Sequence, residues 1–202
     1  MSRTPWIDWF LAHPFAKYFV RIDDSYIQNA SNFEDLKNSF DLFDICYSLI
    51  CGKYIPREKL PSEWPNNIDE SGMILYGLIH SRYIQTDQGI EKMYQKFIEN
   101  SFEKCPRTLC HGIHCLPIGY SNEFGQEPLK MFCPNCGDIY YVDDEDCDCV
   151  DGACFGCDYL PIFLEKHRDV VPEALPEKYV VTLFGYRLIG DGDFEPFSDE
   201  EK

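Results

Sequence analysis

Four cysteines in two close pairs have the residue type and the spacing of a metal site. Cys105 and Cys110 are separated by four residues, and Cys133 and Cys136 are separated by two, with Gly137 next in the chain. Zinc takes four thiolates in a tetrahedron, and tight turns that contain proline and glycine let each pair present two sulfur atoms to one ion. Because four thiolates leave no coordination position open, we predict one structural Zn²⁺ per chain, held in a zinc ribbon.

Neighbouring residues offer alternative ligands. His111 and His114 follow the first pair, and either could replace a thiolate. A second group of four cysteines lies in and after an acidic stretch of the chain: Cys147, Cys149, Cys154 and Cys157. This group is either a second metal site or a set of free thiols, and the carboxylates around it favour free thiols in a solvated loop. The acidic stretch itself lacks the glycine and the glutamate of an EF-hand calcium loop.

The elements that position these cysteines change in character near residue 100. Before it, apolar residues recur at helical spacing, and Ser71 and Thr86 can each cap the N-terminus of a helix. From Cys105 onward proline, glycine and cysteine are frequent and apolar segments are short, which is typical of a small β-rich module. Strands are predicted at 131–132 and 139–142. Residues 178–189 are predicted to be extended, and the acidic tail 191–202 to be disordered.

We therefore predict an α+β fold in three parts. An all-α domain covers residues 1–100, a four-cysteine zinc-ribbon domain covers 101–160, and a C-terminal segment with its acidic tail covers 161–202. No internal repeat is evident in the sequence.

Length and charge limit the classes of function. The chain has 202 residues, a formal net charge of −17 and 45% hydrophobic residues, which is enough to bury a core. Such a charge repels phosphate backbones and anionic lipid, so we expect neither nucleic-acid nor membrane binding, and basic proteins are the better partners. Without an apolar run long enough for a signal peptide or a membrane span, an intracellular location is expected.

Catalytic motifs are missing from the sequence. It has no Gly-rich phosphate loop, no kinase catalytic loop, no Gly-x-Ser-x-Gly elbow and no His-Glu-x-x-His helix. Cys133 and Cys136 could form a redox pair, but they follow no βαβ pattern and have a matching pair of cysteines. We therefore predict that the protein is not an enzyme, with a thiol oxidoreductase as the enzyme-class alternative.

One decapeptide then identifies a resemblance. Residues Leu75–Ile84 closely resemble a signature of the casein kinase II regulatory (beta) subunit. Further matches to that family run in order along the chain and extend from about Trp6 to Ile189: Tyr26–Gln28, Cys105–Arg107, Leu116–Gly119, Cys133–Cys136 and Asp151–Gly156. The gap of 22 residues between the two cysteine pairs is also that of the family.

The resemblance implies an assembly. Family members dimerise through their zinc ribbons, and the dimer holds two catalytic kinase subunits in a heterotetramer. Aromatic residues of a C-terminal segment insert into a groove of the kinase, and the matching residues here are Leu183, Phe184, Tyr186 and Leu188. The two aromatics stand in the reverse of the family's usual order. Strand alternation predicts Phe184 and Tyr186 on one face and Leu183 and Arg187 on the other, whether they dock or pack on their own domain.

The resemblance also has limits. The family usually carries an acidic, polyamine-binding loop before its signature helix, but residues 52–63 here contain Lys53, Arg57 and Lys59. The serine-acidic N-terminal phosphorylation site typical of animal members is not reproduced at Ser2–Thr4, and an acidic stretch stands where many members have a long basic tail. We predict a regulatory subunit in cytoplasm and nucleus that binds the catalytic subunits and modulates their stability, activity and substrate choice. The alternative is a zinc-ribbon dimeric adaptor that has lost kinase binding.

Overall fold

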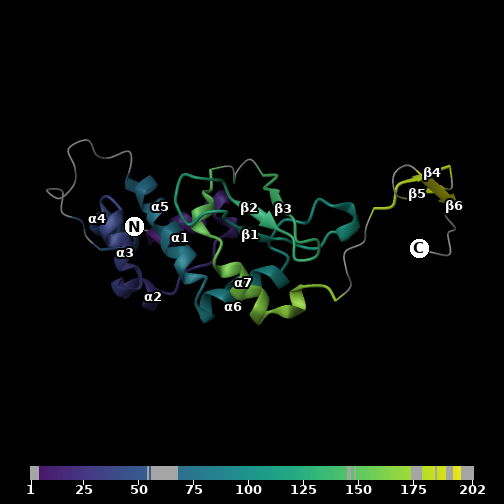
Figure 1. Cartoon of the computed structure of the whole chain (residues 1–202). Coiled ribbons are helices and arrows are strands. Elements are labelled where there is room, and N and C mark those ends of the chain that lie inside the picture. Colours follow the sequence, from purple (N-terminus) through teal and green to yellow (C-terminus); the bar gives the residue numbers. More distant parts are fainter. Residues whose placement is uncertain are drawn as a thin grey trace.

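The computed structural model describes residues 5–53, 55, 68–144, 147, 149–173, 179–184, 186–189 and 193–196. In Figure 1 the helices surround a small sheet, β1–β3, and a second sheet, β4–β6, lies apart from them near the C-terminus. Helices occur together with antiparallel sheets, and the cysteine cluster lies in the β region, so the predicted α+β class is confirmed.

The described residues form seven α-helices, joined by short 3₁₀ turns, and two three-stranded antiparallel sheets. The α-helices are α1 (Trp6–Leu11), α2 (Asp24–Gln28), α3 (Glu34–Ser39), α4 (Phe43–Ile50), α5 (Ile68–Tyr83), α6 (Asp87–Ile98) and α7 (Tyr159–Lys166). The 3₁₀ turns are η1 (Pro14–Tyr18), η2 (Ala30–Phe33), η4 (Thr108–Cys110), η6 (Gly152–Cys154) and η7 (Arg168–Val170). The strands are β1 (Leu116–Ile118), β2 (Lys130–Phe132), β3 (Ile139–Tyr141), β4 (Thr182–Leu183), β5 (Tyr186–Ile189) and β6 (Asp193–Pro196).

Helix α5 is the central helix, because its C-terminal half is buried on all sides. It begins at Ile68, so the prediction that Ser71 caps it is wrong. Asp69 and Glu70 favour the earlier start through the helix dipole, and the Asp69 carboxylate also accepts a hydrogen bond from the Trp6 indole, 3.0 Å away. The cap predicted for α6 is confirmed, since Thr86 accepts from the backbone N–H of Gly89 at 3.1 Å.

Three of the family motifs meet around α5. A Cβ atom on Gly77 would lie 2.3 Å from Cys154 Sγ, and one on Gly119 would lie 2.1 Å from the Gly152 carbonyl oxygen. Glycine is therefore needed at both contacts, since no larger residue fits so close an approach. His80 completes the junction: its Nδ1 donates to the Cys154 carbonyl at 2.8 Å, and its Nε2 accepts from the Val20 N–H at 3.1 Å. Burial lowers the pKa of this fully enclosed histidine to about 4, so the ring is neutral.

The sheet of the ribbon is a meander in the order β1-β2-β3. Leu116, Phe132 and Ile139 stand opposite one another, and so do Ile118, Lys130 and Tyr141. The two predicted strands are present, within one residue of their expected limits. The sheet joins the helices through one continuous apolar core, which extends on both sides of residue 100. The predicted boundary after residue 160 falls within α7, whose Phe163 is fully buried.

The second sheet has the order β4-β5-β6. Strand β6 covers residues 193–196, which pair with β5, so the prediction of a disordered tail is wrong for these four residues. Acidic composition alone gave that prediction, whereas the partner strand supplies backbone hydrogen bonds that composition does not reveal. No helix among the described residues is long and apolar enough to cross a bilayer.

Candidate metal centre and docking hairpin

The first cysteine pair lies on a knuckle before β1. The backbone N–H of Cys105 donates to the Ile113 carbonyl at 2.8 Å, which brings the two arms of the knuckle together. The chain reverses through η4 and then through two left-handed residues, His111 (φ 53°) and Gly112 (φ 73°). This turn places the Cys110 sulfur opposite that of Cys105, as the spacing of the pair predicts.

The second pair lies on the turn between β2 and β3. Cys133 follows β2 directly, and its carbonyl accepts the Gly137 N–H at 2.9 Å. Gly137 has a φ of 73°, the left-handed conformation that glycine adopts without strain. The Cys133 N–H donates to Asp138 at 3.0 Å and returns the chain toward β3. The turn residues that suggested a metal-binding knuckle therefore form a tight turn that presents both cysteines.

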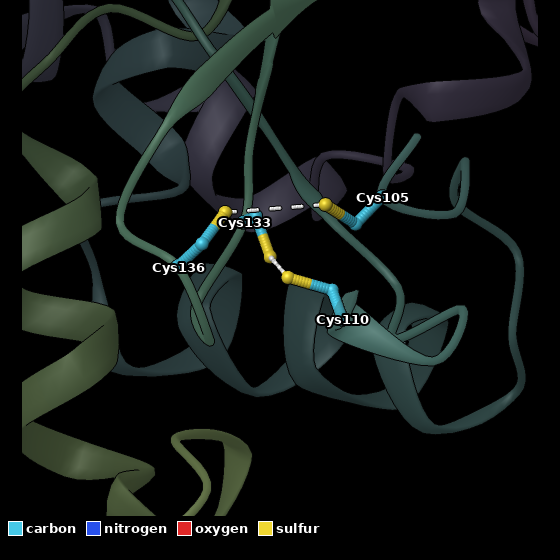
Figure 2. Close-up of side chains that lie close together, drawn as sticks. All are labelled: Cys105, Cys110, Cys133 and Cys136. Atoms are coloured by element: carbon cyan, nitrogen blue, oxygen red, sulfur yellow. Dashed lines mark hydrogen bonds between the residues drawn. The ribbon is translucent and has the colours of Figure 1, made fainter. Parts of the chain in front are cut away.

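The four sulfur atoms converge, as Figure 2 shows. Cys105 Sγ lies 4.0 Å from Cys136 Sγ, Cys110 Sγ lies 3.9 Å from Cys133 Sγ, and all four lie within 4.8 Å of one another. A zinc–sulfur bond of about 2.3 Å requires edges of about 3.8 Å in a tetrahedron of sulfurs. The observed separations fit such a site after a small contraction. The cluster can therefore hold one metal ion.

The surroundings of the cluster fit bound thiolates. Arg107 Nη1 donates to Cys110 Sγ over 3.7 Å, and the Tyr140 hydroxyl lies 3.3 Å from Cys136 Sγ. Burial disfavours ionisation of Cys110, but hydrogen bonds from Arg107 and the neighbouring thiols outweigh it and lower its pKa to about 7. Burial raises the pKa of Cys133 and of Cys105. A divalent cation would supply the charge that makes all four thiolates stable there.

The alternative ligands lie elsewhere. His114 Nδ1 donates to the Phe102 carbonyl at 2.6 Å, which fixes the base of the knuckle. Cys154 is buried against α5, whereas Cys157 is exposed and donates its backbone N–H to Asn122 at 3.2 Å. Over the described part of the chain, the four cysteines of the cluster are the one group placed to share an ion. The later cysteines form no such group among the described residues.

The predicted docking residues lie on a β-hairpin whose apolar side chains are exposed. Leu183 pairs with Tyr186 across a two-residue loop, and Leu188 donates its N–H to Val181 at 2.9 Å. Directly paired residues of antiparallel strands share a face, so these four form one surface, which we call the hairpin face. Their exposed fractions are 44% for Val181, 53% for Leu183, 48% for Tyr186 and 39% for Leu188.

Two features of this hairpin differ from the sequence prediction. The prediction that Leu183 and Tyr186 lie on different faces is wrong. The chain reverses between these two residues, so alternation does not continue through the loop and the two side chains share one face. Phe184 is in the loop, not in a strand, with a φ of 50° and 93% of its surface exposed. A left-handed phenylalanine costs about 1 kcal/mol. Val181 was not predicted, although the apolar alternation of Val181 and Leu183 could have indicated it.

The fold and the cluster define a class: an α+β protein whose small antiparallel sheet carries two cysteine pairs able to hold one metal ion. Comparison with known proteins is more specific. The model of the casein kinase II regulatory subunit family matches residues 5–187. The chain belongs to this family. The family is regulatory, so the prediction of a non-catalytic subunit is confirmed.

Individual relatives show the same similarity. The chain is 32% identical to casein kinase II subunit beta of Schizosaccharomyces pombe over 183 residues, which are 91% of this chain and 78% of that protein. It is 32% identical to subunit beta-2 of Neurospora crassa, with 91% of this chain and 64% of that protein covered. It is 31% identical to subunit beta' of Drosophila melanogaster, with 93% and 85% covered. Several relatives are therefore longer than this chain.

Proposed function

We propose that this chain is a zinc-stabilised subunit that pairs with a second copy and docks onto two catalytic subunits of casein kinase II. The observation that carries the proposal is the hairpin face. Its four apolar side chains are exposed on the β4–β5 hairpin, and Phe184 is exposed in the loop of that hairpin. Exposed apolar surface of this kind is typical of a protein–protein contact. The complex would tune the stability, activity and substrate choice of the kinase.

The chemistry of the four cysteines supports zinc as the ion. Thiolates are soft ligands, and a closed tetrahedron of four sulfurs suits zinc in a structural role. Cys105, Cys110, Cys133 and Cys136 would all be ligands, so the ion would hold the two knuckles together and leave no position for a substrate. One ion per chain is expected.

The strained loop supports docking at Phe184. A conformation that costs about 1 kcal/mol persists where it serves a function, and this one points a large ring into solvent. In a complex the ring and Tyr186 would enter apolar pockets of the partner. Buried aromatic anchors of this kind commonly contribute about 2 kcal/mol or more to binding.

Self-association would use the ribbon sheet. Its Tyr141 is 75% exposed, and Tyr120, just after β1, is 59% exposed. A second copy that covered these rings would bury aromatic surface, which interfaces favour.

The net charge of −17 further suits basic substrate proteins as transient partners. We also propose an intracellular location in cytoplasm and nucleus. The non-acidic loop 52–63 argues against polyamine binding there, and its residues 54 and 56–63 lie outside the described residues.

Light scattering coupled to gel filtration tests the assembly. The zinc-loaded chain mixed with a purified casein kinase II catalytic subunit should elute as a complex of two plus two chains. The combined variant Phe184→Ala, Tyr186→Ala should elute as a dimer without the kinase. Phe124→Ala is the matched control, because this ring is also exposed but lies outside the hairpin. A zinc-loaded dimer that binds no kinase would instead identify the adaptor.

A further inference from the structure

The N-terminal segment makes a polar contact with both ends of the ribbon. Lys17 Nζ lies 3.0 Å from Glu103 Oε1, two residues before the first cysteine of the cluster, and also pairs with Asp144, which follows β3. Glu103 and Asp144 are far apart in sequence, and the whole cysteine cluster lies between them. One lysine of the helical body therefore holds the chain where it enters the ribbon and where it leaves β3.

Tyr18 strengthens the same contact from a buried position. Its side chain is fully buried, and its hydroxyl donates to Glu103 Oε1 at 2.7 Å. The backbone carbonyl of Glu103 accepts the Cys115 N–H at 2.8 Å, so the residue that carries this carboxylate is paired with the second arm of the first knuckle. A buried hydroxyl keeps its single partner firmly, because leaving it unpaired would be costly.

The segment that carries these residues is itself held from behind. Lys96 Nζ of α6 donates to the Phe19 carbonyl at 3.0 Å and also contacts the Lys17 carbonyl. The next residue, Val20, donates its N–H to His80 of α5. Residues 17–20 therefore connect the two central helices to the base of the ribbon, and a movement of the ribbon must strain this connection.

We propose that Lys17 and Tyr18 are positioning residues of the metal centre, which fasten both ends of the ribbon to the helical body and thereby slow the loss of its metal ion. This inference rests on the proposed zinc site. A ribbon released at its base can separate its two knuckles more easily, and an ion held by four thiolates leaves when they separate. By linkage, loss of the ion should in turn loosen residues 17–20.

Transfer of zinc from the loaded full-length chain to a chromogenic chelator tests the inference. Lys17→Met should release zinc about fivefold faster than the wild type. This factor is the one expected when a partly exposed ion-pair network is lost. Lys17→Arg should restore the wild-type rate. The matched control is Lys92→Met, because Lys92 holds the residues just after this segment, Arg21 and Asp23, and these partners lie outside the ribbon. It should release zinc at the wild-type rate.

Tyr18→Phe is a milder variant in case Lys17→Met folds poorly, and it should also accelerate release. Hydrogen exchange gives a second readout: removing zinc should speed exchange at residues 17–20 in the wild type but not in Lys17→Met. Equal release rates for Lys17→Met and Lys92→Met would overturn this inference alone. A wild-type chain that takes up no zinc would overturn the proposed metal site and this inference with it.

Discussion

The two sheets of this protein are alike in topology and opposite in environment. Both are antiparallel and three-stranded, but β1–β3 is part of the core and carries the cysteine cluster, whereas β4–β6 keeps an apolar face exposed. A small sheet is marginal by itself and needs packing or a cross-link for stability. The first sheet packs into the core of its own chain and lies beside cysteines that could hold a metal ion, whereas the second sheet exposes an apolar face. This contrast underlies our proposal that the first sheet serves stability and the second serves recognition.

The largest expected effect breaks the first sheet. Cys133→Ser removes one of four ligands, and in small zinc modules metal binding contributes about 10 kcal/mol or more to folding. We expect loss of bound zinc by elemental analysis and loss of the ribbon's near-ultraviolet circular dichroism. Cys157→Ser is the control, since that cysteine is exposed and outside the cluster. If Cys133→Ser kept one zinc ion per chain, the ligand set would be wrong.

Acid should weaken the junction that His80 makes between α5, Val20 and Cys154. The pKa of His80 is about 4 in the folded protein because of burial, below its ordinary 6.5. The unfolded chain therefore binds the extra proton first, and stability is lost as the pH falls from about 6.5 to 4, by about 3 kcal/mol. Urea unfolding of the wild type and of His80→Gln at each pH measures this loss of unfolding free energy. Acid release of metal affects both proteins, so the difference between them reports the histidine. Parallel curves for the two proteins would contradict this.

The third prediction concerns the second sheet alone. Phe184→Ala and Tyr186→Ala should each weaken binding to the catalytic subunit by about 2 kcal/mol, measured by calorimetry. Neither should lower the thermal stability of the chain, since both side chains are exposed. A large fall in melting temperature would show that these residues stabilise their own chain.

The smallest expected effect adjusts the first sheet without breaking it. Arg107→Ala removes the donor to Cys110, and losing an outer partner of a metal ligand commonly weakens metal binding by about tenfold. Competition with a chelator of known affinity measures the change, and Arg107→Lys should recover part of it. Kinase binding at saturating zinc should be unaffected. An unchanged zinc affinity would mean that Arg107 has no influence on the cluster.

Local signals made the cluster predictable. The spacing of the cysteines, the prolines after Cys105 and Cys133 and the left-handed Gly137 all act within a few residues, so the sequence contains them in full. The Thr86 cap is predictable for the same reason. The family signature then supplied what local rules do not, the segment that would dock.

The positions of chain reversals and the contacts between distant residues escaped prediction. The pairing of β6 with β5 and the position of Phe184 in the loop depend on where the chain reverses, which alternation cannot locate. The contact of Lys17 with Glu103 joins residues far apart in sequence, and polar side chains leave no periodic pattern. Such contacts follow from the packing of the fold, and only the coordinates reveal them.

Hydrogen exchange of the zinc-loaded chain, with and without the catalytic subunit, tests the division between the two sheets most directly. We expect the kinase to slow exchange in the hairpin, at residues 179–189, and to leave exchange in β1–β3 as it is in the dimer without kinase. Protection of β1–β3 by the kinase, with the hairpin exchanging as freely as before, would contradict the account.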